Sequence, residues 1–300
     1  MSIDLTQLSQ PAVIETLDFE ALLTARKAAL VALYPADQQA TITATLELES
    51  EPIVRILEES CYRELVLRAR YNDEARELML AYATGTNLDH IGVSYYQEER
   101  LLVTAADTTA VPPVAAVYES DDDFRQRLAD KVESYSVAGP TAAYEWLAKS
   151  ASGKVADAKC DSPQPGTSRI AILSTEGDGT PDAALLATVL TALSADTVRP
   201  LCEEVLVVPA QVQHYAIDVT LYPEADESPS QAAAVTALTA YAAARHKLKK
   251  SVSISGIIAA ANASGVQKIV VNAPAADISC SAQQSAYCTG ITVTVAEVSA

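Results

Sequence analysis

The sequence predicts an α+β protein, in which a helical N-terminal region with one long bundle-forming helix precedes two tandem α/β sandwich-like domains. Apolar residues recur at steps of three and four in the first third of the chain, as helices require. From about residue 154 onward, short β-like runs alternate with helical ones. The chain has 300 residues, more than one core usually holds, so several domains are expected. The expected boundaries are 1–96 for the helical domain, 97–210 for the middle domain and 211–300 for the C-terminal domain.

The N-terminal region is predicted to contain two helices followed by a much longer one. Residues 18–34 form the first, with Asp18 as the N-cap and Pro35 as the stop. A short helix over 36–47 follows. The long helix starts after Ser50, the expected N-cap, and meets no breaking residue before Gly85. At about 33 residues it would span roughly 50 Å, which indicates a bundle or coiled coil, often with a partner chain.

The stretch LMLAYATGTNLDHIGVSYY, residues 78–96, is predicted to join two helices. Gly85 suits the left-handed position that ends a helix, and Asn87 can cap a short helix over 88–95. The neighbouring Asp89 and His90 raise two alternatives, a catalytic corner or a metal site. His90 has no second His or Cys at ligand spacing, whereas Asp89 is favourable in the first turn of a helix. We therefore interpret the stretch as a helix junction.

The remaining elements follow from caps, breakers and alternation. Residues 101–123 are predicted to be an extended link, after which Ser120 or Asp121 caps a helix over 122–134. Further helices are expected over 138–153, after the turn EGDGTPD with Thr180 as cap and Pro181 as first residue, and over 230–248 and 252–265. Strands are expected over 154–160, 168–175, 202–210, 213–222, 266–272 and 290–298. Ala151-Ser152-Gly153 recurs as Ala263-Ser264-Gly265 between a helix and a strand, which suggests two related α/β units.

Charge and composition exclude several classes of function. The net charge is −18 and the pI is about 4.5, so the surface repels a phosphate backbone and no nucleic-acid partner is expected. The basic run His246, Lys247, Lys249, Lys250 lies at a predicted helix end, where cations complement the helix dipole. No signal peptide and no apolar run of membrane-spanning length occur, so we expect a soluble protein made in the cytoplasm. The five cysteines lack C-x-x-C spacing, which fits a reducing compartment.

No motif in the sequence predicts catalysis, a cofactor or a metal. Asp121, Asp122 and Asp123 suit a helix start better than a calcium loop, and Gly177-Asp178-Gly179 lacks the rest of a phosphate-binding motif. His90, His214 and His246 lie outside recognisable catalytic signatures. Glu58-Glu59 and Glu203-Glu204 are adjacent pairs whose side chains must point in different directions. The sequence leaves open a carboxylate pair assembled from distant segments, but the expectation is a protein without enzymatic activity.

Several segments together resemble the baseplate J-like family of contractile-tailed bacteriophages and R-type pyocins. The similarity runs from about residue 3 to the end of the chain. The segments that carry it are DFEALLTARKAALVALYPADQQ, TLELESEPIVRILEESCYRELVLRARYNDEAR, LAYATGTNLDHIG, ESDDDFRQRLADKVESYSVAGPTAAY, the SPQPG loop and SAYCTGITV.

The resemblance implies a structural wedge subunit of the baseplate in the virion tail, assembled in the host cytoplasm. Two copies would join one smaller partner of the baseplate protein I type, with the N-terminal helices in a bundle. Six wedges would ring a central hub, touching one another through the C-terminal domains, and the ring would widen when the sheath contracts. Further contacts with the hub, the sheath initiator or fibre-network components are implied. Two alternatives remain at this stage: a tail-associated cell-wall hydrolase, and an adhesin for host-surface sugars.

Overall fold

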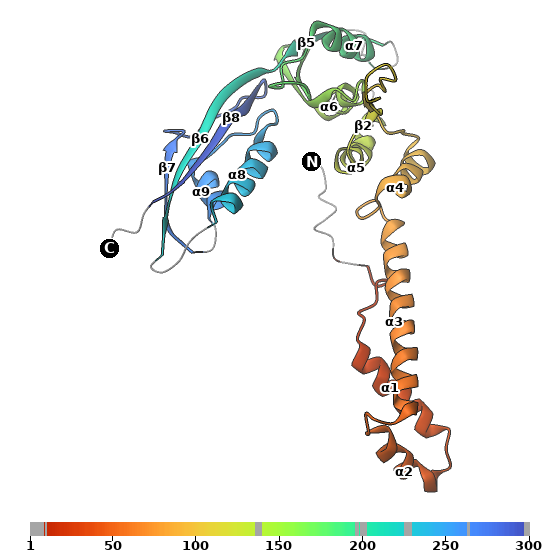
Figure 1. Ribbon diagram of the computed structural model, residues 1–300. Helices are drawn as coiled ribbons and strands as arrows, with labels where there is room; N and C mark the ends of the chain where they lie inside the picture. The colour runs from red at the N-terminus through yellow and green to blue at the C-terminus, as the bar shows by residue number, and fades with distance from the viewer. Residues whose placement is uncertain are drawn as a thin grey trace. The chain divides into compact units, whose positions relative to one another are not determined.

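The computed structural model describes residue 9 and residues 11–135, 140–195, 198, 203–224, 230–262 and 265–296. Its internal contacts divide the chain into two compact units, Met1–Glu99 and Arg100–Ala300. The first unit is helical, and the second contains small mixed sheets packed with helices (Figure 1). The predicted α+β class is therefore confirmed, while the finer boundary between residues 210 and 211 stays a prediction.

The first unit is built on one long helix with a shorter one beside it (Figure 1). Its elements are α1 (Phe19–Ala32), α2 (Ala36–Leu46), α3 (Pro52–Glu77), α4 (Gly85–Ile91) and the π-helical turn Gly92–Tyr96. Asp18 caps α1 as predicted, because its carboxylate accepts a hydrogen bond from the Ala21 backbone N–H at 3.1 Å. At 26 residues, α3 extends roughly 40 Å.

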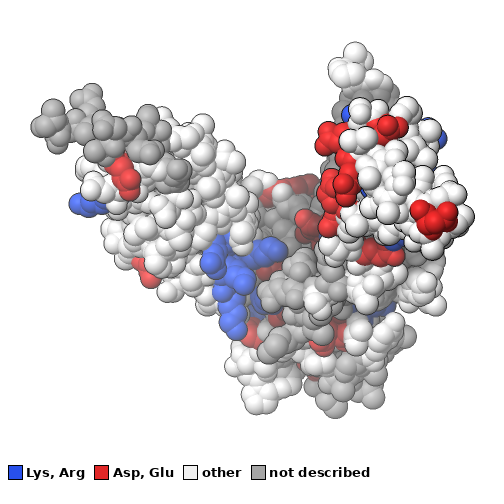
Figure 2. Space-filling model, turned by 90° about the horizontal axis from the view of Figure 1, so that it is seen from below, with Lys and Arg blue, Asp and Glu red and all other residues white. Residues whose placement is uncertain are grey.

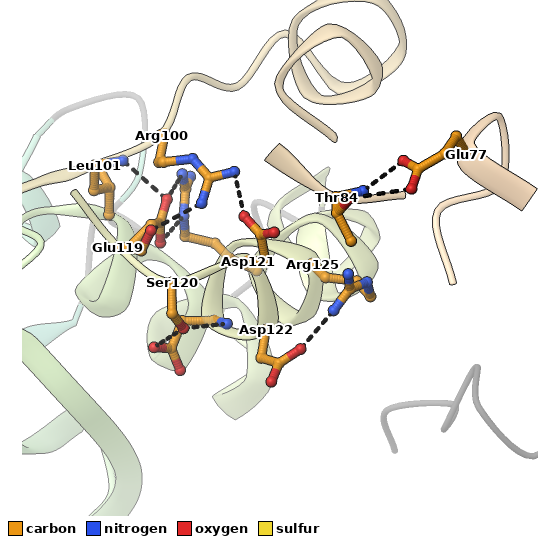
Figure 3. A network of polar contacts seen from close by, with 11 residues as sticks. Glu77, Thr84, Arg100, Leu101, Glu119, Ser120, Asp121, Asp122 and Arg125 are labelled. Atoms are coloured by element: carbon orange, nitrogen blue, oxygen red, sulfur yellow. Dashed lines mark hydrogen bonds and ion pairs between the residues drawn. The ribbon is translucent and has the colours of Figure 1, made fainter. Parts of the chain in front are cut away.

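Both ends of the long helix differ from the prediction. Its N-cap is Glu51 rather than Ser50, and it ends at Glu77 rather than running to Gly85. The Glu77 carboxylate accepts hydrogen bonds from the Thr84 backbone N–H at 2.9 Å and from the Thr84 hydroxyl at 3.0 Å (Figure 3). Thr84 thereby becomes the N-cap residue of α4, and Gly85, at φ +51°, is the first residue of that helix. Asn87 lies inside α4 and not at its cap.

The second unit begins with a short antiparallel pair and a three-stranded sheet. The pair is β1 (Leu102–Thr104) and β2 (Val117–Tyr118), followed by α5 (Asp121–Ala129) and the 3-10 helix Asp130–Tyr135. The sheet contains β3 (Val155–Gln164), β4 (Thr167–Ser174) and β5 (Glu204–Pro209) in the order β3-β4-β5. β3 is antiparallel to β4 and β5 is parallel to it. Helices α6 (Thr141–Ser150) and α7 (Ala183–Leu193) pack on this sheet over a core that includes Tyr144, Ile170, Ile172 and Val189.

The N-cap of α5 was predicted correctly, whereas the predicted N-cap of α7 was wrong. Ser120 caps α5 by accepting from the Asp123 backbone N–H. The cap of α7 is Asp182, which accepts from the Leu185 backbone N–H at 2.7 Å, and not Thr180. A carboxylate directly before the first helical turn is the stronger acceptor. Residues 138–139 and 202, which the predicted elements included, lie outside the described residues.

The chain ends in a second three-stranded sheet, ordered β7-β6-β8. Its elements are β6 (Gln211–Pro223), α8 (Gln231–Arg245), α9 (Ile254–Ala261), β7 (Val266–Ala273) and β8 (Gln284–Val295). Both helices lie on one face of the sheet (Figure 1), where Leu238 of α8 is buried in one cluster with Ile217, Val219 and Leu221 of β6. β8 begins at Gln284 rather than at 290, because Tyr287 and Cys288 pair with His214 and Tyr215 on β6.

Both sheets place a central strand between one antiparallel and one parallel neighbour, but the chain visits these strands in a different order. The proposed relation between the two α/β units therefore stays a prediction. Residues 263–264 of the second Ala-Ser-Gly lie outside the described residues. Within the part of the chain that the structure describes, every helix is too short or too polar to cross a membrane.

The two sheets are joined through a single residue, Ala210. Its backbone N–H donates to the Ile172 carbonyl at 2.9 Å, and the next residue, Gln211, donates to the Gln283 carbonyl at 2.8 Å. Ala210 is buried in a small cluster with Ala171, Leu173 and Leu248. β4 is consequently covered on both faces, which explains why its last five residues are all buried.

Candidate assembly surface on the long helix

One face of α3 is occupied by α1 and by the segment before it. Val54 and Cys61 are buried on this face, and a ladder of charges lies along it. Glu64 pairs with both Arg26 and Arg68, and Arg68 also pairs with Glu15 at 2.8 Å. The hydrogen bond from Arg26, followed by that from Arg68, holds the pKa of Glu64 below its usual range. This face is thus committed to packing within the chain.

Another face of α3 carries large apolar side chains that the described residues leave exposed. They are Ile53, Ile56, Leu67, Tyr71 and Leu78 at the end of the helix, and we call them the α3 stripe. Ile56 is 67% exposed, Tyr71 58% and Leu78 81%. Their spacings of 3, 11, 4 and 7 residues bring them to one side of a helix with 3.6 residues per turn. An exposed apolar stripe of this length is typical of a surface that another helix covers.

The apolar positions of the long helix are therefore divided between two faces. Leu57, Cys61 and Leu65 are buried or half-buried, whereas Leu67, Tyr71 and Leu78 are exposed. A periodicity in sequence identifies apolar positions but does not tell which of them the same chain covers.

A groove of about 720 Å³ lies where α3 ends and α4 begins. Leu78, Ile91 and Tyr95 supply its apolar surface, and it is further lined by Arg70, Asp73, Glu74, Glu77, Asn87, His90 and Ser94. Arg70 pairs with Glu74 at 2.7 Å, and Asp73 pairs with Arg76 at 2.8 Å. Apolar residues rimmed by charged ones are common in protein interfaces. The groove continues the α3 stripe, since Leu78 belongs to both.

His90 lines this groove, and Asp89 is the fifth of the seven residues of α4, so its predicted place in the first turn of the helix was wrong. In the described ranges, no cluster of three His, Cys, Asp or Glu has a metal-binding arrangement. The junction interpretation is correct in outline, although Glu77 rather than Gly85 is the residue that organises it.

The three aspartates at the start of α5 each have a structural partner (Figure 3). Asp121 pairs with Arg100 at 2.8 Å, Asp122 pairs with Arg125 at 2.6 Å, and Asp123 accepts from the Ser120 hydroxyl. These contacts favour the helix-start interpretation over a calcium loop.

Beside them lies a buried ion pair that the sequence did not indicate. The guanidinium of Arg127 pairs with the Glu119 carboxylate at 2.6 Å, with side chains only 4% and 9% exposed. Glu119 also accepts from the Leu101 backbone N–H at 2.9 Å (Figure 3), and the Trp146 indole donates to the Arg127 carbonyl. The pair fixes β2, α5 and α6 together. A spacing of eight residues across a strand-to-helix turn gives no signal of such a contact in sequence.

Two of the three histidines lie close together in the second unit. His214 pairs with Asp178 at 3.0 Å, and Tyr287 contacts the rings of both His214 and His246. Ser285 lies 3.3 Å from His246 Nδ1. A serine–histidine–aspartate relay requires both partners on one imidazole, but here Asp178 and Ser285 contact different histidines. The cluster is therefore not arranged for nucleophilic catalysis.

The Gly177-Asp178-Gly179 loop is crowded by side chains at Gly179, whereas the space at Gly177 is open. A Cβ at Gly179 would lie 2.6 Å from Leu173 Cδ1 and 2.9 Å from His246 Nε2. Hydrogen bonds from Thr180, more than the contact with His214, lower the pKa of Asp178. The loop thus acts as a tight turn packed against the last sheet.

The adjacent carboxylates diverge as predicted. Glu58 pairs with Arg55 and Glu59 with Arg63, while Glu203 accepts from the Tyr144 hydroxyl at 2.8 Å and Glu204 is exposed. Among the described residues, Cys61, Cys160, Cys280 and Cys288 are free thiols. Burial raises the pKa of Cys160 to about 11, so this thiol stays protonated and weakly nucleophilic near neutral pH.

Comparison with known proteins gives one consistent result along the chain. Three family models match: the baseplate J-like N-terminal domain at residues 49–107, the central domain at 136–209 and the C-terminal domain at 215–294. The chain is also 46% identical to baseplate protein J of Escherichia phage P2 over 289 residues. That alignment covers 96% of this chain and 95% of the phage P2 protein.

Proposed function

Because this chain belongs to the baseplate J-like family, we propose that it is a structural subunit of the baseplate wedge in a contractile tail or tailocin. Two copies join one smaller wedge protein of the protein I type, and six such wedges form a ring around the hub that rearranges when the sheath contracts. The protein acts without catalytic residues, cofactor or metal. Its site of action is the tail baseplate, where hub, sheath-initiator or fibre-network components are further neighbours.

The α3 stripe is the observation that supports this proposal most directly. Ile56, Tyr71 and Leu78 are large apolar side chains left uncovered by α1, on a helix roughly 40 Å long. Burying such side chains stabilises by roughly 1.5–3 kcal/mol each, so a helix laid along the stripe would gain several kcal/mol. A bundle of α3 from two copies with a helix of the smaller partner would cover both the stripe and the groove at its end.

The first experiment is to co-express the chain with the product of the neighbouring small baseplate gene and measure mass by size-exclusion chromatography with light scattering. We expect a complex with two copies of this chain per partner. Replacing Ile56 and Leu67 by Asp places two charges in the α3 stripe and should abolish the complex. The matched control replaces the exposed Val132 and Leu190 by Asp, outside the long helix, and should leave the complex intact.

Two results would contradict the proposal. A wild-type chain that stays monomeric beside its partner would remove the wedge assignment. A cleared band on a peptidoglycan zymogram would show a hydrolase activity and would contradict the purely structural role.

A further inference from the structure

β8 is an edge strand of the last sheet and carries no charged residue. The sheet order is β7-β6-β8, so within the described residues β8 has a strand on one side only. Its sequence is QSAYCTGITVTV, twelve residues without a charge or a proline. Proteins commonly protect an exposed edge with charged side chains, with proline or with a covering element, because free backbone groups pair with other extended chains. β8 lacks the first two protections, so the element beside it decides how much of the edge is open.

Helix α8 covers the two ends of this edge. The side chain of Gln231, its first residue, donates to the Val293 carbonyl. His246, directly after its end, lies with Nδ1 3.0 Å from the Ala286 carbonyl. α8 therefore runs antiparallel to β8 and occupies a carbonyl near each end of the strand. The open part of the edge is the stretch between Ala286 and Val293.

A groove of about 450 Å³ lies along that stretch, between α8 and β8, and we call it the β8 groove. The strand lines it with residues 287–291, and the helix side supplies Thr239, Ala242, Ala243 and His246. The small side chains on α8 leave space that larger ones would fill. A Cβ at Gly290 would likewise have no other atom within 4 Å beyond its chain neighbours. The volume falls within the range of roughly 300–1,000 Å³ that is typical of ligand sites.

The backbone of β8 turns hydrogen-bonding groups away from β6 at this groove. In a parallel ladder, alternate residues face the neighbouring strand. The Gln283 carbonyl and the Ala296 N–H both bond to β6, on either side of a register shift at Tyr215. Counting in steps of two from these residues, Cys288 and Ile291 face away from β6. In the described part of the chain, no residue bonds to the outward N–H and C=O groups of these two.

These features specify the kind of molecule that fits. Outward backbone groups bind another extended backbone as an added strand, and a hollow beside them receives every second side chain of that strand. Among the described residues that line the β8 groove, none is Asp, Glu, Lys or Arg, so a charged side chain would be buried there without a partner. The C-terminal sheet with its helices, at the left of the view, shows mostly uncharged surface (Figure 2). An uncharged strand is therefore favoured.

A single extended segment fits this edge better than a second copy of the chain does. β8 of a second copy would bring its own α8 to the same edge, with Gln231 and His246 again on the outer carbonyls. The two helices would then compete for the space beside strands that must approach to roughly 4.8 Å. A segment without a helix beside it meets no such obstacle.

We propose that the β8 groove binds an extended, uncharged segment of a partner protein, which adds a strand to β8 and places alternate apolar side chains between β8 and α8. This inference goes beyond the proposed function, because a wedge scaffold does not require such a site. Recognition through backbone and apolar contacts predicts binding that changes little with salt, unlike binding through exposed charges.

The test titrates the full-length chain with a capped synthetic hexapeptide of alternating valine and serine, and follows backbone amide resonances by NMR. We expect saturable shifts at Cys288, Thr289 and Ile291 that are similar at about 50 mM and about 500 mM salt. The same peptide with every backbone nitrogen methylated keeps its side chains but loses its donors, and it should not bind. A peptide with glutamate in place of valine should not bind either.

Two substitutions fill the β8 groove from the helix side. Ala243→Leu and Thr239→Leu should each weaken binding of the valine peptide by roughly tenfold or more, because small changes of volume in an apolar pocket have effects of that order. The matched control is Ala240→Leu, at an exposed alanine of the same helix that does not line the groove. This variant should bind as the wild type does.

Several results would overturn the inference. Absent or non-saturable shifts at β8, equal binding of the methylated peptide, or full binding by both filled variants would each show that the edge takes no added strand. Shifts at β8 that depend on the concentration of the chain without peptide would identify a second copy as the occupant. The complex with the smaller wedge partner is measured separately, so the proposed function can stand when this inference fails.

Discussion

At the scale of single residues, the Glu119–Arg127 pair should contribute strongly to stability. Both side chains are buried, so removing one charge leaves the other without compensation in a medium of low polarity. We expect Glu119→Gln to reduce the free energy of unfolding of the second unit by about 3 kcal/mol. Trp146, the only tryptophan, donates its indole N–H to the Arg127 carbonyl, so urea unfolding can be followed by its fluorescence.

The matched control for this prediction is Glu176→Gln. Glu176 pairs with Lys154 at 2.8 Å, but both side chains are well exposed, and such pairs contribute about 0–1 kcal/mol. If both variants lose the same free energy of unfolding, the buried pair stabilises the second unit no more than an exposed pair does.

Sequence reasoning succeeds for residues whose partners are close in the chain. Asp18 and Ser120 were identified as caps because a cap bonds a backbone N–H only three residues away. It fails where two acceptors compete, as with Thr180 and Asp182, and where the partner is distant. The Asp157 carboxylate, for example, accepts from Leu248, which follows it by 91 residues. Nothing in the local pattern indicates such a contact.

At the scale of elements, the junction between α3 and α4 depends on Glu77. Its carboxylate accepts from the backbone and the hydroxyl of Thr84 and from Asn87 Nδ2. Glu77→Ala should free these donors and destabilise α4 by about 1 kcal/mol, as loss of a helix cap does. Hydrogen exchange of the amides of Gly85–Ile91 should then become roughly fivefold faster, since 1.4 kcal/mol corresponds to tenfold.

Glu74→Ala serves as the control, because Glu74 is a nearby carboxylate of α3 that pairs only with Arg70 among the described residues. Faster exchange in α4 with both variants would assign the effect to lost charge rather than to the lost cap.

The packing of α1 on α3 should depend on pH through Glu64. Arg26 and Arg68 lower its pKa in the folded chain, so its contribution to stability is present above the ordinary carboxyl pKa. That contribution is lost as the pH falls through the lowered pKa. Thermal melting of wild type and Glu64→Gln should therefore differ near pH 7, and the difference should shrink as the medium becomes strongly acidic. A difference that is constant with pH would rule out this linkage.

Most elements were predictable from periodicity, and the errors have physical causes. The predicted long helix extended too far toward the C-terminus because Leu78, Leu80 and Tyr82 continue its apolar pattern. In the structure the helix ends at Glu77, whose carboxylate accepts a hydrogen bond from the Thr84 backbone N–H. β8 was predicted too short because Tyr287 and Cys288 show no clear alternation, and their place in the sheet comes from pairing with β6. The exposure of the α3 stripe could not be predicted, because it required the packing of α1 on α3 to be known.

At the scale of the whole molecule, Leu248 ties the two sheets of the second unit to each other. Its side chain completes the cluster of Ala171, Leu173 and Ala210 between them. Leu248→Ala should cost about 3 kcal/mol of unfolding free energy, within the range for a fully buried leucine. Leu190→Ala, at a position 41% exposed, should cost well under half as much. Limited proteolysis in the α8–α9 loop should be faster in the first variant alone, and equal rates would contradict this role.

The passage from β5 to β6 through Ala210 has a mechanical consequence. A linker with slack absorbs displacement, but here hydrogen bonds to Ile172 and to Gln283 hold consecutive residues on either side of the crossing. β4 with β5 and β6 with β8 are parallel pairs, so tension along the chain loads their hydrogen bonds in shear, several at once. Pulled from its ends, the second unit should therefore transmit load from one sheet to the other as a stiff element. When the second unit first lengthens under force, a sheet should rupture, and the connection at Ala210 should not lengthen before that.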